Sequence, residues 1–234
     1  MSNPNLFAFG MRLKGGAPNV PSRTAFAARR TVDRAFKRSF DFSLAFSVLA
    51  ILLPLFALVA LSIWIVDGGS PFFRHARLGR GRSSFGCLKF RTMRIDGQEV
   101  LARHLAENPD ALVEWNRTRK LKDDPRVTPI GRVLRKTSLD ELPQLINILR
   151  GEMSVVGPRP IVEEEVERYG DAAQAYFAVR PGLTGAWQVS GRSDTTYAER
   201  VRLDRQYVET WSFLSDLKII LRTIPVVFFV KGAY

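Results

Sequence analysis

The stretch FSLAFSVLAILLPLFALVALSIWIV, residues 42–66, decides the architecture of this chain, because none of its 25 residues is charged. A helix needs about 20 apolar residues to cross the hydrocarbon core of a bilayer. The stretch is therefore predicted to be a membrane segment rather than a buried core helix. A secretory signal peptide fits less well, because the apolar region is too long and no small-residue cleavage site follows Val66.

Two features of this segment favour a path that enters the membrane and returns to the same side. Pro54 stands at its midpoint, where proline removes one backbone N–H and kinks or breaks a helix. Basic residues flank both ends, and flanks rich in Lys and Arg stay on the cytoplasmic side. Each half would reach only ~18 Å into a core about 30 Å thick. The sequence predicts a re-entrant helix–break–helix, with a spanning helix kinked at Pro54 as the alternative.

The positive charge of the chain is concentrated in front of this segment. The 234 residues carry a formal net charge of +12, and residues 1–40, with eight basic residues and one acidic residue, hold +7 of it. We expect residues 1–22 to be a flexible basic arm and residues 23–40 to continue as a basic amphipathic helix. This distribution suits anionic lipid headgroups beside a membrane segment and disfavours nucleic acid, which would need basic residues across the globular part.

The rest of the chain, residues 67–234, is expected to form a mixed α/β domain that is mainly helical with short strands. A strand is predicted at 85–91, where apolar residues alternate with others. Loops are predicted at 119–131, 150–160 and 180–192. Helices are predicted at 97–118 with an interruption at Pro109, at 132–149 around a break, at 163–169 and at 195–211.

The last apolar stretch, residues 213–230, places apolar side chains at helical spacing and is interrupted at Pro225. Charged residues occupy other faces of the predicted helix. This pattern is typical of an amphipathic helix that lies in the membrane interface. The alternative is packing in the core or against a second copy in a homodimer.

The run TSLDELPQ, residues 137–144, carries the sharpest concentration of reactive side chains. Ser138 and Glu141 fit a capping box, so a helix is predicted to start here with Asp140 and Glu141 in its first turn. One carboxylate could be a nucleophile or metal ligand while the other aids proton transfer or orientation. The structural alternative is that both acidic residues only favour the dipole of the helix.

Arginines on loops rich in glycine and proline accompany this acid pair. Three such loops, around Arg159, Arg180 and Arg192, can offer planar bidentate donors to phosphate oxygens. Together with the acid pair they indicate a phosphorylated ligand and a divalent cation. A second pair, Asp123 and Asp124, loosely resembles the acidic metal motif of nucleotide-sugar glycosyltransferases. The sequence contains no GxxxxGK[ST], HExxH or GxGxxG motif, and its single cysteine excludes an internal disulfide.

Taken together, these segments resemble the bacterial sugar transferase family, the monotopic phosphoglycosyl transferases, over about residues 35–232. The order and spacing of the segments make chance similarity very unlikely. The single apolar segment near the N-terminus is similar to that of the exopolysaccharide-initiating members. The matching segments are KRSFDFSLA (37–45), KFRTM (89–93), DPRVTPIG (124–131), RKTSLDELPQLINILRGEMSVVGPRP (135–160) and RPGLTGAWQVSGR (180–192).

The resemblance implies an enzyme that transfers a sugar 1-phosphate from a UDP-sugar to undecaprenyl phosphate and releases UMP. It implies that Asp140 is the nucleophile, forms a covalent phosphosugar intermediate and binds Mg²⁺, while Glu141 assists. Arg159, in the GPRP match, is the best candidate for phosphate binding. Weaker candidates for the same role are Arg135, Lys89, Arg91, Arg180 and Arg192.

The resemblance also implies a monotopic protein on the cytoplasmic face of a bacterial inner membrane. Residues 23–66 would form the basic segment and the re-entrant helix broken at Pro54, and residues 67–234 the catalytic domain. Many members have serine before this proline, where this chain has Leu53. Galactose and glucose both suit the transferred sugar. The alternatives are an ordinary nucleotide-sugar glycosyltransferase, which would release UDP, and a non-enzymatic membrane-anchored binding protein.

Overall fold

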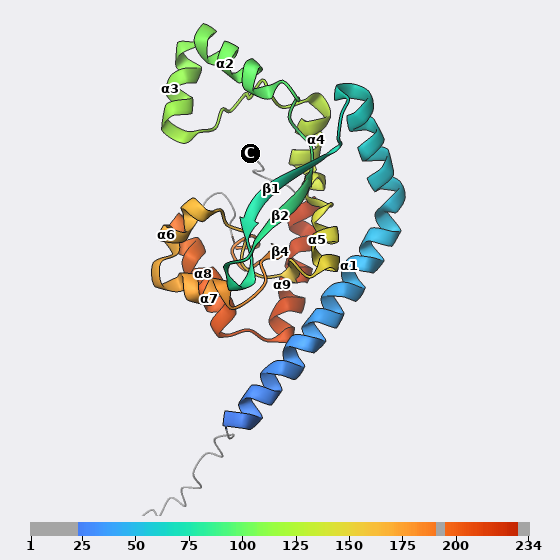
Figure 1. Cartoon of the computed structure of the whole chain (residues 1–234), viewed down its shortest axis with the longest axis vertical. Helices are drawn as coiled ribbons and strands as arrows, with labels where there is room; N and C mark the ends of the chain where they lie inside the picture. Colours follow the sequence, from blue (N-terminus) through green and yellow to red (C-terminus); the bar gives the residue numbers. More distant parts are fainter. Residues whose placement is uncertain (1–22, 191–194, 229–234) are drawn as a thin grey trace, which may run out of the picture. The chain divides into compact units, whose positions relative to one another are not determined.

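The computed structural model describes residues 23–190 and 195–228. The predicted basic arm at 1–22 and the candidate Arg192 lie outside the described residues. Within these ranges the chain is mainly helical with short strands, as the sequence predicts (Figure 1).

Helix α1, Arg23–Asp67, is the longest element and contains the apolar stretch. Many of its large apolar side chains are exposed, among them Ile51 (75%) and Trp64 (59%). The part from Asp33 to Asp67 is long and apolar enough to cross a membrane, by length and composition alone. A row of exposed apolar side chains of this extent marks a surface that contacts lipid or another protein.

Helical conformation continues through Pro54, so the described residues show no break into two separate helices. Proline removes one backbone hydrogen bond and crowds the preceding turn, which can bend a helix without forcing its residues out of helical geometry. Figure 1 shows such a bend between the light-blue and teal turns of α1. The re-entrant path through a bilayer stays a prediction.

An antiparallel hairpin follows α1 and consists of β1, Phe72–Leu78, and β2, Ser84–Phe90. The turn between the strands contains η1, Arg80–Arg82. Gly81 in this turn has a φ of +67°, a left-handed conformation that glycine adopts without a steric penalty. The predicted strand at 85–91 is therefore confirmed to within one residue at each end.

Side-chain alternation gives the hairpin two different faces. Phe72 and Phe90 pair across the strands, and their rings pack against Phe56 of α1 with centroids 5.7 and 4.8 Å away. Asn147 lies beside the edge of β2 that does not pair with β1. Its Oδ1 accepts from the N–H of Leu88, and its Nδ2 donates to another carbonyl of the same strand, both at 2.9 Å. One hairpin face is thus covered by the apolar helix, and the opposite face packs into the core through Phe85 and Cys87.

The middle of the chain is helical. The first two helices are separated at Pro109, as predicted. This proline stands in the first turn of the second helix, where its missing N–H breaks no hydrogen bond. Thr128 begins the third, because its Oγ1 accepts from the N–H of Gly131 at 2.9 Å. A Cβ on Gly131 would lie only 2.1 Å from the carbonyl oxygen of Thr92, so glycine is required. The helices are α2 (Gly97–Glu107), α3 (Pro109–Thr118), α4 (Pro129–Thr137) and α5 (Gln144–Arg150).

The C-terminal part combines a pair of short parallel strands with further helices. Ser154 of β3 lies opposite Gly182 of β4. Three-residue strands are too short to show alternation, so the sequence predicted only loops over both segments. The elements are β3 (Ser154–Val156), η3 (Glu163–Glu165), α6 (Val166–Tyr169), η4 (Gly170–Ala172), α7 (Ala173–Phe177), β4 (Gly182–Thr184), α8 (Tyr197–Glu209) and α9 (Phe213–Phe228).

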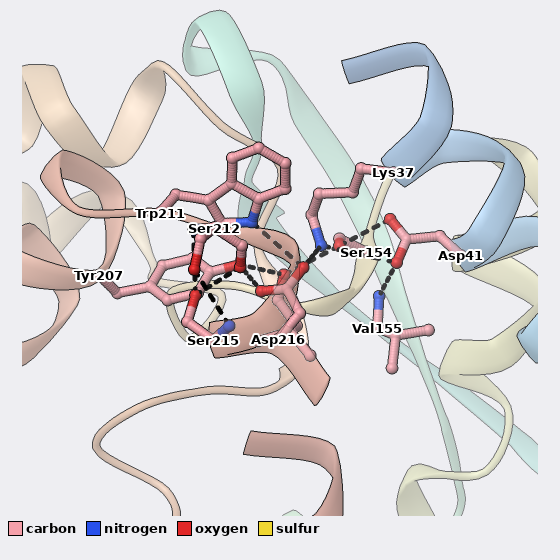
Figure 2. Close-up of polar contacts among 10 residues, drawn as sticks. Lys37, Asp41, Ser154, Val155, Tyr207, Trp211, Ser212, Ser215 and Asp216 are labelled. Atoms are coloured by element: carbon pink, nitrogen blue, oxygen red, sulfur yellow. Dashed lines mark hydrogen bonds and ion pairs between the residues drawn. The ribbon is translucent and has the colours of Figure 1, made fainter. Parts of the chain in front are cut away.

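A buried polar group, the anchor cluster, consists of Lys37, Asp41 and Asp216 and joins α1 to α9 (Figure 2). Lys37 Nζ lies 3.7 Å from Asp41 Oδ1 and 2.6 Å from Asp216 Oδ2. Asp41 also accepts from the hydroxyl of Ser154 at 2.7 Å and from the N–H of Val155 at 3.1 Å. Lys37 therefore forms ion pairs with both carboxylates, and these pairs belong to a larger network.

The second carboxylate of the anchor cluster is equally well satisfied. Asp216 accepts from the hydroxyl of Tyr207 at 2.7 Å and from Nε1 of Trp211 at 3.1 Å. Arg38, although it is close to Asp41 in the sequence, forms no ion pair with it. Its guanidinium instead donates to the last carbonyl oxygens of α5, a position that favours a positive charge.

Helix α9 leaves apolar side chains exposed on one side. Leu214 and Leu221 are both more than half exposed, while Asp216 and Ile219 are buried. The helix continues through Pro225, so the predicted interruption there is wrong: the proline occupies a helical position. Placement of this helix in a membrane interface stays a prediction.

Candidate active site

Asp140 and Glu141 lie in η2, Leu139–Glu141, a single 3₁₀ turn between α4 and α5. The predicted capping box is wrong, because Ser138 has a left-handed backbone, with a φ of +57°, and its hydroxyl caps no N–H of this turn. The N–H of Ser138 instead closes the end of α4 by donating to the carbonyl of Arg135 at 3.2 Å. The two carboxylates therefore stand on a tight turn between two helices.

Lys89 of β2 links the two carboxylates. Its Nζ lies 2.7 Å from Glu141 Oε1 and 3.3 Å from Asp140 Oδ2. Alternation places Lys89 on the hairpin face opposite to Phe90, which packs on α1. The register of the hairpin thus brings a residue that the sequence suggested only as a phosphate ligand into direct contact with both acids.

Burial distinguishes the two carboxylates from each other. The side chain of Asp140 is 12% exposed, whereas that of Glu141 is 36% exposed. Burial raises the pKa of Asp140, the charge of Lys89 opposes this rise, and the charge of Glu141 adds to it. Burial disfavours the ammonium of Lys89, but the carboxylates of Glu141 and Asp140 outweigh it and raise the pKa of Lys89. A protonated lysine therefore sits beside a poorly solvated aspartate and a solvent-accessible glutamate.

One further cation, Arg77, and the imidazole of His75 share the face of the hairpin that carries Lys89. Pairing across the strands places His75 and Arg77 of β1 on this face. Burial lowers the pKa of His75, and the charges of Arg77, Lys89 and Arg159 lower it further. Nη2 of Arg77 lies 3.1 Å from Nδ1 of His75. Sequence reasoning missed Arg77 as a site residue. The two-residue alternation of β1 indicates which of its residues share a face. Only the strand register shows that the face of Arg77 is also that of Lys89.

Arg159 is presented by a rigid loop between β3 and η3. The N–H of Gly157 in this loop donates to the carbonyl of Thr184 in β4 at 3.0 Å. A Cβ on Gly157 would lie 2.6 Å from the carbonyl oxygen of Arg180, so only glycine permits this approach. The guanidinium of Arg159 lies over the ring of Trp187, 5.9 Å from its centroid, and forms no ion pair with any described residue. Arg159 is thus a positioned cation with free donors.

Arg135 also faces the acid pair. Its Nε donates to Oγ1 of Thr92 at 2.9 Å, and its positive charge is among those that lower the pKa of Asp140. The structure therefore places two of the predicted phosphate ligands, Lys89 and Arg135, at the acid pair. The charge of Arg159 acts on the hairpin face that carries Lys89.

Two other predicted phosphate ligands make different contacts. Arg91 forms an ion pair with Asp67 at 3.3 Å and donates to the carbonyl of Gly68, so it caps the C-terminal end of α1. Arg180 donates from Nε to the carbonyl of Gly151 at 2.6 Å, beyond the far end of α5. Neither contact involves the acid pair.

The two acid pairs differ as metal ligands. Asp124 is held by Arg126 in a bidentate contact, with N–O distances of 2.6 and 2.8 Å, which leaves little capacity for a cation. Among the described residues, only Lys89 forms hydrogen bonds or ion pairs with the carboxylates of Asp140 and Glu141. Mg²⁺ usually binds through one or two protein carboxylates together with substrate phosphates and water. The donor set of the acid pair fits such a site, although the described residues hold no group of three potential ligands.

Comparison with known proteins gives a consistent assignment. Residues 32–230 match the bacterial sugar transferase family. The exopolysaccharide production protein ExoY of Rhizobium meliloti is 54% identical over 215 residues, which is 92% of this chain and 94% of that protein.

Two longer relatives align with this chain over less than half of their own length. The undecaprenyl-phosphate galactose phosphotransferase of Salmonella typhimurium is 48% identical over 86% of this chain and 42% of that protein. The UDP-glucose:undecaprenyl-phosphate glucose-1-phosphate transferase of Escherichia coli K12 is 36% identical over 99% of this chain and 49% of that protein. The chain therefore belongs to the bacterial sugar transferase family.

Proposed function

We propose that this protein transfers a sugar 1-phosphate from a UDP-sugar to undecaprenyl phosphate and releases UMP, as the first membrane step of exopolysaccharide or related glycan synthesis. The observation that carries the proposal is the buried Asp140, which shares Lys89 with the accessible Glu141. The names of two relatives include a sugar transfer to undecaprenyl phosphate, and that of a third includes exopolysaccharide production.

Asp140 supplies the nucleophile in this proposal. One of its carboxylate oxygens forms a bond to the β-phosphorus of the UDP-sugar, and the bond from that phosphorus to the bridging oxygen breaks, so that UMP leaves with the electron pair. A phosphate oxygen of undecaprenyl phosphate then attacks the same phosphorus and releases the carboxylate. The covalent intermediate divides one difficult displacement into two easier steps.

The surrounding cations lower the cost of bringing anions together. Lys89, Arg135 and Arg159 would neutralise the diphosphate and hold its phosphorus in line with Asp140. Lys89 would have to exchange part of its contact with the acids for contact with phosphate. Glu141, the more exposed acid, would orient the reacting groups or move a proton. Mg²⁺, held by Asp140, would supply further charge neutralisation when bound.

The membrane would deliver the lipid substrate to this site. We propose that α1 is a re-entrant anchor bent at Pro54, that α9 lies in the interface, and that the catalytic part faces the cytoplasm at a bacterial inner membrane. The exposed apolar side chains of α1 and α9 support this arrangement. Cysteines introduced near residues 38 and 75 should then react with an impermeant reagent from the same side. Labelling from opposite sides would mean a spanning helix.

The released nucleotide separates this proposal from its rivals. The full-length protein is incubated with undecaprenyl phosphate and either UDP-galactose or UDP-glucose, and the nucleotide product is identified. UMP supports the proposal, and the better donor identifies the sugar, since the names of relatives include both galactose and glucose. UDP would indicate an ordinary glycosyltransferase. No product from any of a wider panel of UDP-sugars would indicate a binding protein.

A further inference from the structure

A polar cavity of about 180 Å³ lies beyond the C-terminal end of α5. The acid pair precedes α5, and seven helical residues separate its turn from this end by ~10 Å. No residue of the cavity lining contacts Asp140 or Glu141, so the cavity is distinct from the candidate active site. Its polar lining consists of Arg80, Ser83, Ser84, Gly151, Glu152 and Arg180.

Positive charge accumulates around this cavity. Burial lowers the pKa of Arg180, the nearby charges of Arg80 and Arg38 lower it further, and the carboxylate of Asp41 opposes this shift without reversing it. Like charges held together at a partly buried position are unfavourable unless an anion compensates for them. Among the described lining residues, only Glu152 carries a carboxylate, and its Oε2 already accepts from Asn147 at 2.6 Å.

These arginines keep unused hydrogen-bond donors. A guanidinium has five N–H donors. Arg38 donates to two carbonyl groups of α5, whereas the side chain of Arg180 makes one hydrogen bond within the described part of the chain, from Nε to the carbonyl of Gly151. Arg80 makes no side-chain hydrogen bond or ion pair with any residue that the structure describes. The capping of α5 therefore accounts for Arg38 but not for Arg80 or for the remaining donors of Arg180.

We propose that this cavity is a second anion site, which binds a phosphate group between Arg80 and Arg180 with the hydroxyl of Ser84 as a further donor. Its volume is about six times the ~30 Å³ share of one water molecule, enough for a phosphate group. Paired guanidinium groups are well suited to phosphate oxygens.

The position of the cavity relates it to the membrane segment. A Cβ on Gly151 in its lining would lie 3.5 Å from Nη2 of Arg38, only four residues before Phe42 begins the uncharged stretch. A phosphate in the cavity would therefore sit close to the level at which α1 enters the apolar region. The phosphate could belong to a lipid headgroup or to a soluble phosphate, and the two sources share the same chemistry.

The test measures ligand binding by the full-length protein in detergent. The probes are inorganic phosphate and short-chain phosphatidylglycerol, with short-chain phosphatidylcholine as the uncharged comparison. Affinity is read from the concentration dependence of the unfolding midpoint. Arg80→Gln should weaken binding about tenfold, the effect of losing one charge-assisted contact to phosphate. The exposed, unpaired Arg80 gives this variant no reason to misfold, and Ser84→Ala provides a second, milder variant.

Arg82→Gln is the matched control. Arg82 lies in the same turn, is exposed, pairs with Glu163 and does not line the cavity. Phosphate bound near Lys89 and Arg159 would be shared by all variants, so only the difference between variants counts. Stabilisation by phosphatidylglycerol but not phosphatidylcholine would identify a lipid headgroup, and stabilisation by phosphate alone a soluble ligand. Equal affinities in Arg80→Gln and Arg82→Gln, or no saturable binding of either probe, would overturn the proposal.

Discussion

The anchor cluster and the acid pair use the same arrangement of side chains for different purposes. In each, a lysine lies between two carboxylates. Lys37 is 2.6 and 3.7 Å from its two partners, and Lys89 is 2.7 and 3.3 Å from its own. The ion-pair distances alone would not tell which of the two regions carries chemistry.

The difference lies in what else the carboxylates contact. Asp41 and Asp216 are 2% and 0% exposed, and each accepts two further hydrogen bonds. Among the described residues, Asp140 and Glu141 accept from Lys89 alone, and Glu141 is open to solvent. A buried charge with all its hydrogen bonds made stabilises a fold, whereas one with spare acceptor capacity can receive a ligand.

The largest effect is expected from Asp140→Asn. The amide cannot attack phosphorus, so kcat for UMP release should fall by at least about 10³-fold. Removal of a poorly solvated charge should leave the thermal unfolding midpoint unchanged or higher. Near-normal turnover would show that Asp140 is not the nucleophile, and a collapse of the midpoint would place it with the anchor cluster instead.

Lys37→Met should break the anchor cluster. Two buried carboxylates would lose their shared cation, and loss of one partner of a buried ion pair typically costs about 3–5 kcal/mol of unfolding free energy. Denaturant unfolding measures this loss. Turnover per folded molecule should change little, because the substituted residue lies outside the active site. Unaltered stability would contradict the structural role of the cluster.

Lys89→Met should reduce activity more than stability, whereas Lys37→Met should reduce stability more than activity. Loss of a cation that faces the phosphates should lower kcat/KM by about 10²-fold. The destabilisation should be smaller than for Lys37→Met, because Glu141 can be solvated in its place. The comparison of the two lysine variants in the same activity and unfolding assays is the informative control. Equal losses of stability would remove the distinction between the two regions.

A smaller, pH-dependent effect is expected at Asp204. It accepts from the hydroxyl of Tyr169 at 2.8 Å, and burial raises its pKa from 3.8 to about 7 despite the opposing charges of Arg200 and Arg159. Its folded pKa exceeds its unfolded pKa, so its contribution to stability is complete below about pH 4 and is lost as the pH rises through 7. The slope is at most about 1.4 kcal/mol per pH unit.

Asp204→Asn should remove this decline. Unfolding midpoints of the variant and the natural protein, measured from pH 5 to pH 8, should diverge in favour of the variant as the pH rises. Parallel profiles over this range would contradict a raised pKa for Asp204.

The elements that the sequence predicted are those with a strong local cause. Pro109 separates two helices because it fits only the first turn of the second. The alternation of apolar residues at 85–91 predicted β2 because a strand turns successive side chains to opposite faces. The interruption predicted at Pro225 is wrong because a proline can remain inside a helix when its neighbours keep helical geometry, and Pro54 likewise lies inside α1. The β3–β4 pair depends on a contact between distant segments and has no local signal.

In the candidate site, too, some features follow from the local sequence and others depend on contacts between distant segments. Asp140, Glu141 and Arg159 could be named from motifs, but their environment could not. The contact of Lys89 with both acids depends on the register of the hairpin. The left-handed backbone of Ser138, which replaces the predicted capping box, results from the junction of two helices rather than from the residue type.

The most direct test of the central claim is intact-mass measurement of the full-length protein after incubation with a UDP-sugar in the absence of undecaprenyl phosphate. We predict up to one UMP released per protein molecule and a mass increase of one sugar phosphate, located on the peptide that contains Asp140 and absent from Asp140→Asn. Addition of undecaprenyl phosphate should remove the adduct. Product formation with lipid present, but with no adduct and no UMP release in its absence, would contradict a covalent intermediate on Asp140.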